Sequence, residues 1–104
     1  MAENKLPTAC PSCRSALVVT RLRCRTCASA VEGEFGLGVL ARLEDEEQAL
    51  VLRLVKSSGS LKDLAAEYGV SYPTIRNRVD ALIDRVKQIE KELARAAKES
   101  GHGR

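Results

Sequence analysis

The four cysteines of this 104-residue chain form two C-x-x-C pairs separated by ten residues. Each C-x-x-C turn can direct two sulfurs at one point, and two such turns supply the four thiolates that tetrahedral zinc binds at about 2.3 Å. Because four protein ligands leave no position for water or substrate, the expected site is structural rather than catalytic. The spacing therefore predicts one structural zinc per chain, bound by Cys10, Cys13, Cys24 and Cys27.

Other uses of these thiols stay open. The same shell fits iron in a rubredoxin-like site, and oxidation of the thiolates could eject the metal as a switch. Disulfides are the main structural alternative. The longest apolar runs, Ala16 to Val19 and Ala49 to Leu52, are too short for a secretory signal or a membrane span. We therefore expect a cytoplasmic protein without a membrane partner, in a reducing compartment that disfavours disulfides.

Strand-forming residues occupy the stretch between the two cysteine pairs: Leu17, Val18, Val19 and Leu22. We expect residues 14–23 to form a β-hairpin that links the two turns, with Val31 to Phe35 as a third strand. This layout is a zinc ribbon, assigned to residues 1–38. Ribbon turns usually carry glycine directly after the second cysteine. Arg14 and Ala28 stand there instead, and a left-handed backbone would cost each on the order of 1 kcal/mol.

Helical patterns follow the ribbon. Gly36 and Gly38 predict a hinge, so we place the module boundary near residue 38 and a helical domain over residues 39–84. The acidic run Glu44 to Glu47 could be an interaction patch, but it is better explained as the first turn of a helix, where carboxylates stabilise the dipole. An apolar stripe continues that helix to the Ser57-Ser58-Gly59 break.

The next segment has the order of a helix-turn-helix. Ser60 is a candidate N-cap, Gly69 supplies a left-handed stop, and Ser71 starts a further helix with Pro73 at an early position. Small residues between the helices and an apolar anchor at Ile75 complete the motif. A helical hairpin in any bundle could imitate part of this pattern.

The start of the third helix carries the predicted DNA-contacting residues. Arg76 can donate two bonds to guanine and Asn77 can bridge adenine, whereas Asp80 and Asp84 would repel DNA further along the helix. Only the first two turns should therefore enter a major groove. The alternative is that these are solvated polar residues on a structural helix. The full predicted set is Ser71, Tyr72, Pro73, Thr74, Arg76, Asn77 and Arg78.

An apolar stripe outlasts this domain. It continues through residues 85–99, beyond what a monomeric three-helix unit needs, and a second copy of the same helix is one way to cover it. We expect a parallel homodimeric coiled coil with Arg85 facing Glu90 of the partner. The extension folding back on the ribbon or on the first helix is the alternative, and higher oligomers stay open. The predicted dimer seam is Leu82, Val86, Ile89 and Leu93.

Charge and composition exclude several other functions. The chain carries 17 basic and 14 acidic residues, and four thiolates with a divalent ion would lower the net charge of +3 to about +1. Residues 70–104 nevertheless hold eight basic and five acidic side chains, so the basic surplus lies with the predicted DNA-contacting helix.

No set of catalytic residues is apparent in the sequence, and His102 stands alone in a flexible tail, residues 100–104. We predict neither an enzyme nor a small-molecule substrate.

Three stretches resemble a bacterial domain-of-unknown-function family, number twenty eighty-nine: Thr20 to Cys24, Val31 to Phe35 and, most specifically, Gly69 to Asp80. The resemblance covers roughly Cys10 to Ile83. It implies a zinc ribbon joined to a helix-turn-helix similar to that of sigma-factor region four, with the four cysteines as metal ligands. Relatives tend to carry Gly or Pro in the cysteine turns where this chain has Arg14, Arg25 and Ala28.

We therefore expect a mainly α protein: a small N-terminal β zinc ribbon, then a three-helix helix-turn-helix domain whose last helix extends into a short coiled coil. The predicted function is a homodimeric transcriptional regulator that binds double-stranded DNA through the major groove, with structural zinc as its cofactor. The alternative is a protein-interaction adaptor that binds RNA polymerase or a sigma factor rather than DNA.

Overall fold

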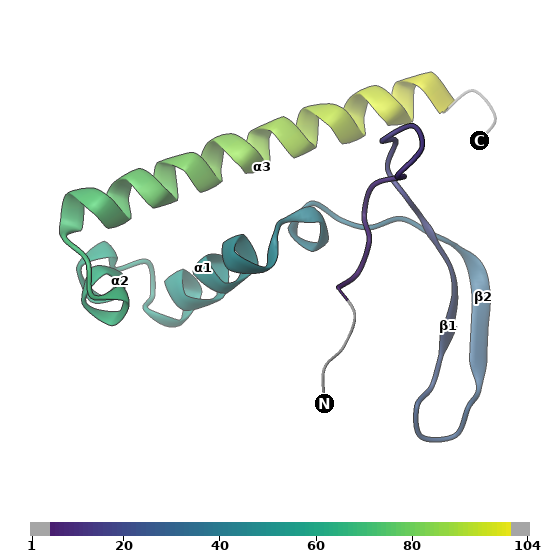
Figure 1. Cartoon of the computed structure of the whole chain (residues 1–104), viewed down its shortest axis with the longest axis horizontal. Helices are drawn as coiled ribbons and strands as arrows, with labels where there is room; N and C mark the ends of the chain where they lie inside the picture. Colours follow the sequence, from purple (N-terminus) through teal and green to yellow (C-terminus); the bar gives the residue numbers. More distant parts are fainter. Residues whose placement is uncertain (1–4, 101–104) are drawn as a thin grey trace. The chain divides into compact units, whose positions relative to one another are not determined.

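The computed structural model describes residues 5–100, with side chains described through residue 95. The chain forms a two-stranded sheet followed by a short 3-10 helix and three α-helices (Figure 1). His102 and the predicted tail beyond Ser100 lie outside the described residues.

Two compact units divide the chain, the first ending at Arg42 and the second beginning at Leu43. This division falls a few residues after the predicted boundary near residue 38. The reason is the side chain of Arg42, whose Nε donates to the carbonyl oxygen of Leu37 at 3.0 Å and whose Nη1 donates to that of Thr8 at 3.3 Å. We call residues 5–42 the ribbon unit and residues 43–100 the helical unit.

The ribbon unit contains one antiparallel hairpin. Strand β1 (Val19–Arg23) pairs with β2 (Ala30–Phe35), and the turn between them holds the second cysteine pair (Figure 1). The predicted hairpin inside residues 14–23 is therefore wrong, since that stretch contributes a single strand whose partner is β2. The physical reason lies in the sequence: residues 14–23 contain no glycine, proline, asparagine or aspartate, the residues that form tight turns.

No buried hydrophobic core forms within the described ribbon unit. Every residue of β2 is exposed, and Leu22, Val31 and Phe35 keep 51%, 58% and 39% of their surface accessible. An isolated two-stranded hairpin is only marginally stable in water. The ribbon unit therefore needs a further source of stability, such as a metal ion or a partner surface.

Helix α1 (Asp45–Lys56) follows the 3-10 helix η1 (Leu40–Arg42). A reciprocal capping box starts α1: the backbone N–H of Glu44 donates to Oε1 of Glu47 at 2.8 Å. The acidic run is thus a helix start, as predicted. Such a start satisfies backbone N–H groups that have no partner inside the helix.

Helices α2 (Leu61–Tyr68) and α3 (Tyr72–Ser100) form the predicted helix-turn-helix. The Ser60 hydroxyl accepts the N–H of Asp63 at 3.1 Å, which caps α2. Gly69 ends α2 with a left-handed φ of 68°, and the N–H of Val70 donates to the carbonyl oxygen of Ala65 at 3.0 Å. This hydrogen bond closes the tight turn that leads into α3.

Replacing Gly69 with alanine should destabilise the helical unit by about 1 kcal/mol, because a side chain at positive φ is strained even where space is free. Denaturant unfolding followed by helical circular dichroism measures this change. Gly36→Ala is the matched control, since Gly36 has open space and no positive φ. Equal effects of the two substitutions would contradict the left-handed turn.

The core of the helical unit joins all three α-helices. Leu64 of α2 and Ile75 of α3 are both 0% exposed, and Ala65 next to them is 5% exposed, so the two helices pack closely. Leu50 contributes from α1 at 7% exposure. The start of α3 is therefore fixed in direction by buried contacts.

In the described part of the chain, no helix combines the length and apolar character that crossing a membrane requires.

Candidate metal centre and nucleic-acid interface

The two cysteine pairs form turns with the same backbone geometry, which we call the first knuckle (Cys10–Cys13) and the second knuckle (Cys24–Cys27). In each, the N–H of the first cysteine donates to the carbonyl oxygen five residues later, at 2.8 Å and 2.7 Å. The N–H four residues after that cysteine donates back to its carbonyl oxygen, at 2.8 Å and 2.9 Å. Each knuckle is thus already folded as a two-sulfur half of a metal site.

The residue after each knuckle is left-handed, as expected: φ is 67° at Arg14 and 66° at Ala28. Because glycine adopts this conformation without strain, Ala28→Gly should stabilise the second knuckle by about 1 kcal/mol, close to a fivefold gain in zinc affinity. Competition against a chromophoric chelator measures that affinity. Ala30→Gly, within β2, is the control and should not raise it; a gain there but not at Ala28 would contradict the proposed strain.

Hydrogen bonds to sulfur favour the thiolate forms needed for metal binding. The pKa of Cys10 lies below its usual range, mainly because of backbone N–H groups of its own knuckle, and Ser12 N–H donates to Cys10 Sγ at 3.3 Å. The pKa of Cys27 is lowered chiefly by the Ser29 hydroxyl, whose oxygen lies 3.1 Å from Cys27 Sγ. None of the four cysteines is in a disulfide, and only Cys10 is partly shielded from solvent.

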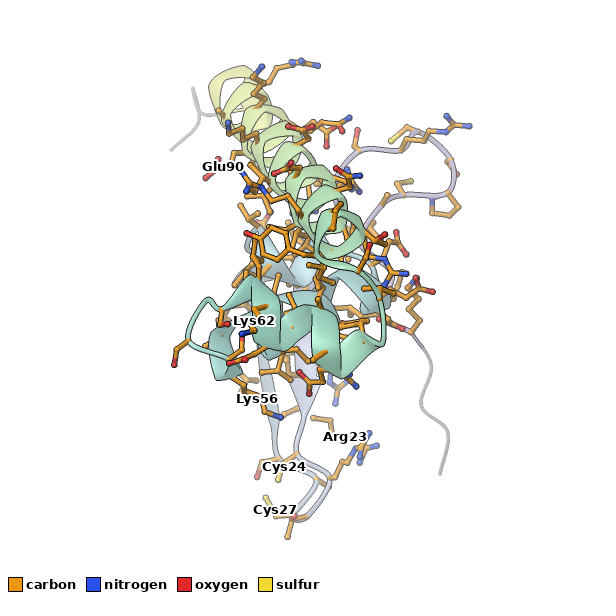
Figure 2. The ribbon with its side chains drawn as sticks, turned by 90° about the vertical axis from the view of Figure 1, so that its left-hand side faces the viewer. Arg23, Cys24, Cys27, Lys56, Lys62 and Glu90 are labelled. Atoms are coloured by element: carbon orange, nitrogen blue, oxygen red, sulfur yellow. The ribbon has the colours of Figure 1, made fainter. Side chains whose placement is uncertain are left out.

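The two knuckles do not meet within one chain. Among the described residues, no group of three or more cysteine, histidine or acidic side chains is placed to hold a metal ion. Figure 2 shows Cys24 and Cys27 together at the tip of the hairpin, whereas the first knuckle precedes β1 at its other end (Figure 1). The metal site of Cys10, Cys13, Cys24 and Cys27 stays a prediction.

Strand geometry explains the separation. The five residues of β1 span about 16 Å at 3.3 Å per residue. Thiolates that share one zinc lie at most about 4.6 Å apart, twice the Zn–S bond length. The donor chemistry of each knuckle fits zinc, and β1 is extended between the two knuckles in this structure.

All seven residues predicted to contact DNA are exposed at the turn before α3 or in its first two turns. The Ser71 hydroxyl lies 2.9 Å from that of Thr74 and accepts the Thr74 N–H at 3.3 Å, so both residues cap α3. Arg76 and Asp80 form a loose ion pair, 3.8 Å between Nε and Oδ1, with side chains 57% and 58% exposed. Such an exposed pair is weak and leaves the guanidinium available to another partner.

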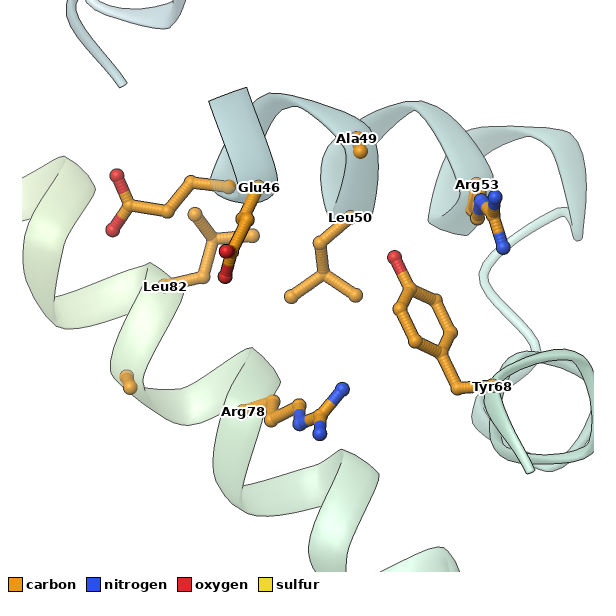
Figure 3. Close-up of a pocket in the computed structure, with 9 residues that line it drawn as sticks. Glu46, Ala49, Leu50, Arg53, Tyr68, Arg78 and Leu82 are labelled. Carbon is orange, nitrogen blue, oxygen red and sulfur yellow. The ribbon is translucent and has the colours of Figure 1, made fainter. Parts of the chain in front are cut away.

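Arg78 lies differently from the other candidates. Its guanidinium carbon is 5.6 Å from the centre of the Tyr68 ring, and that of Arg53 from α1 is 5.1 Å away (Figure 3). Each contact contributes roughly 0.5 to 1 kcal/mol at an exposed site. Arg78 is therefore directed towards α1 and α2 rather than to the outer surface of α3.

A cavity of about 540 Å³ lies beside this stack in the helical unit and escaped the sequence analysis. The sequence contains only a weak sign of this cavity. Tyr68 is one of only three aromatic residues in the chain, but the spacing of Tyr68 alone suggested an ordinary apolar helix position. The lining residues are Glu46, Glu47, Ala49, Leu50, Arg53, Tyr68, Arg78, Ala81 and Leu82.

Two residues of the predicted dimer seam are buried in the structure and two are half-buried. Leu82 and Ile89 are 7% and 2% exposed, and Val86 and Leu93 are half-buried. The dimer seam therefore stays a prediction. The coiled coil itself stays a prediction.

Two family models match the chain. Residues 10–41 match the DUF2089 zinc ribbon, and residues 43–89 match the domain of unknown function (DUF2089)-HTH, where HTH denotes helix-turn-helix. The two matches end and begin where the ribbon and helical units meet. No curated protein and no solved structure shows significant similarity to the chain.

Proposed function

Because the chain belongs to the DUF2089 family, with its zinc ribbon and its HTH domain, we propose that it is a transcriptional regulator that binds double-stranded DNA as a homodimer. The two domains support nucleic-acid binding, and we propose no enzymatic activity. The observation that carries the proposal is the start of α3, where Arg76 and Asn77 are exposed directly beside the fully buried Ile75.

The packing of α3 in the helical unit supports this function. In an HTH domain the second helix of the motif enters the major groove, and its first turns contact base edges. Here the capped start of α3 is held by Ile75 against α2, so exposed side chains next to Ile75 have a fixed direction. Arg76 would donate to guanine and Asn77 would bridge adenine.

The flanking candidates have different proposed roles. Ser71 and Thr74 would contact phosphate groups, because their hydroxyls lie at the N-terminus of α3, where backbone N–H groups also favour an anion. Tyr72, which is 49% exposed, and Pro73 would lie against the groove wall. Arg78 is the weakest of the seven candidates, since it stacks on Tyr68.

Structural zinc is the cofactor that we propose, with the two knuckles as its half-sites. Bound zinc would join knuckles that are otherwise separate and would leave no open coordination position. It supplies folding energy to a ribbon unit whose described residues bury no hydrophobic core. We propose no catalytic role for it.

A duplex-binding assay tests the proposal. Duplexes selected from a random pool should bind, and the logarithm of the binding constant should fall linearly with the logarithm of salt concentration. The two helices of a homodimer should select half-sites about 34 Å apart, one helical turn of DNA. The absence of any duplex binding at low salt would overturn the proposed function.

A second candidate, an adaptor that binds RNA polymerase or a sigma factor, is favoured by the outer face of α1. Leu52 and Val55 lie one turn apart there and are 59% and 68% exposed. Neighbouring exposed apolar side chains of this kind can form part of a protein-binding surface. An adaptor would not bind bare duplex, and Leu52→Lys would abolish its capture of the polymerase or sigma factor. In a DNA-binding protein, the same substitution would leave duplex affinity unchanged.

A further inference from the structure

The cavity beside Tyr68 has the size and position of a site for a small molecule. Its volume of about 540 Å³ lies within the roughly 300 to 1,000 Å³ that is typical of ligand pockets. Residues of α1, α2 and α3 all contribute to its wall, so the whole cavity belongs to the helical unit. The base contacts proposed for Arg76 and Asn77 do not use it.

One end of the cavity is positively charged. Arg53 of α1 and Arg78 of α3 place their guanidinium carbons 5.1 Å and 5.6 Å from the centre of the Tyr68 ring (Figure 3). Among the described residues, neither guanidinium forms an ion pair with a carboxylate. Contact with an aromatic ring does not use the N–H donors of a guanidinium, so both groups can still donate to an anion. The hydroxyl of Tyr68 is a further donor at this end.

The middle of the cavity is apolar and its other end is acidic. Leu50 and Leu82 line the middle and are each 7% exposed. Glu46, Leu50 and Arg53 follow one face of α1, because residues four and seven positions apart share a helix face. Glu46 and Arg53 are therefore about 10 Å apart along the helix axis, at 1.5 Å per residue. Figure 3 shows Leu50 between them.

We propose that this cavity binds a small amphipathic anion, a molecule with one acidic group, such as a carboxylate, on an apolar body. The acidic group would lie between Arg53 and Arg78, since guanidinium groups donate paired hydrogen bonds to carboxylates. The apolar body would pack on Leu50 and Leu82 and lose its contact with water. Glu46 would repel a second acidic group at the other end. This inference goes beyond the proposed function and does not depend on DNA binding.

A DNA backbone suits the two arginines less well than a small molecule does. Its phosphates carry a negative charge at every step, and Glu46 and Glu47 in the same wall would repel the neighbouring phosphates. The backbone also has no large apolar part to cover Leu50 and Leu82. A single acidic group on an apolar body matches both the charges and the apolar lining of the cavity.

Fluorescence titration with the dye anilinonaphthalenesulfonate tests the proposal, because this probe has one sulfonate on an apolar ring system. Arg53→Gln/Arg78→Gln should weaken its binding at least about tenfold, since charge-assisted hydrogen bonds are lost. The neutral dye phenylnaphthylamine has the same rings without the sulfonate, and it should bind equally well to this variant and to the unmodified protein. Arg85→Gln/Arg95→Gln removes two charges of α3 that do not line the cavity, and it should leave binding of both dyes unchanged.

Competition between two acids of equal chain length tests whether the site takes one acidic group or two. Octanoate should displace the dye at a concentration at least about fivefold lower than octanedioate, whose second carboxylate would meet Glu46. Glu46→Gln should narrow this difference by improving the binding of octanedioate. Because loss of structure does not improve binding, this variant tests the site even if the arginine variant is less stable. Helical circular dichroism checks the fold of each variant.

Three results would overturn the proposal. The first is equal binding of anilinonaphthalenesulfonate by the unmodified protein and by Arg53→Gln/Arg78→Gln. The second is equal displacement of the dye by octanoate and octanedioate. The third is displacement by duplex DNA but not by octanoate, which would assign the two arginines to nucleic-acid binding. Arg76→Ala/Asn77→Ala, expected to lose sequence preference, should bind the dye as the unmodified protein does, so failure of this inference is distinct from failure of the proposed function.

Discussion

Replacing Ile75 with alanine should lower the free energy of unfolding of the helical unit by about 2 to 5 kcal/mol. The Ile75 side chain is 0% exposed, so alanine leaves a cavity in the core that joins α2 and α3. Small domains are stable by only about 5 to 15 kcal/mol in total. The substitution should therefore unfold a substantial fraction of the helical unit on moderate heating.

Ile83→Ala is the matched control for this prediction. It removes the same atoms from the same helix, but Ile83 is 44% exposed. Its effect should stay below about 1 kcal/mol, because little burial is lost and alanine favours helix. Denaturant unfolding followed by circular dichroism measures both variants. Equal destabilisation by the two substitutions would contradict the packing of α3 on α2.

Replacing Arg76 and Asn77 with alanine should produce the largest change in DNA recognition. Each substitution should weaken binding to the selected duplex by about 1 to 3 kcal/mol, a factor of roughly 5 to 150, since each removes a two-bond contact to a base. Binding to unrelated duplex should change far less after Asn77→Ala, because the amide carries no charge. Fluorescence anisotropy at fixed salt measures both affinities.

Lys91→Ala separates base contacts from general charge effects. Lys91 is exposed on α3, several turns beyond the two turns expected in the groove. Its removal should lower all duplex affinities slightly and equally, without changing sequence preference. If Lys91→Ala altered the preference as strongly as Asn77→Ala does, the proposed contact surface at the start of α3 would be wrong.

Local hydrogen-bonding signals made the helical unit predictable. Ser60, Gly69 and Ser71 each act on a backbone group within a few residues, so their roles depend little on the rest of the fold. The left-handed backbone at Arg14 and Ala28 was also anticipated, because a C-x-x-C turn imposes it regardless of side chain. Motifs with short-range causes were therefore recovered from sequence.

Longer-range arrangements were predicted less well. Two C-x-x-C pairs specify the ligand types, but they do not specify the backbone conformation of the stretch between them. The missing information was in the stretch 14–23, which has strand-forming residues without a turn. The strand-forming residues of the ten-residue gap suggested a hairpin there, whereas the lack of glycine, proline, asparagine and aspartate favours the single strand β1.

The end of α3 shows a similar limit. Helical spacing identifies Val86 and Ile89 as one apolar stripe, but periodicity does not say what covers it. Ile89 is 2% exposed without a second copy. Tyr68 likewise occupies an ordinary apolar position in the pattern, and its contacts with Arg53 and Arg78 depend on how three helices meet.

Methylation interference on a selected duplex tests the central claim most directly, namely that the start of α3 contacts base edges in the major groove. Methylation of guanine N7 adds a group in that groove at the atom to which Arg76 would donate. We predict that methylating one guanine in each half-site blocks binding, and that Arg76→Ala removes this sensitivity. Binding that tolerates methylation of every guanine, with or without Arg76, would contradict the claim.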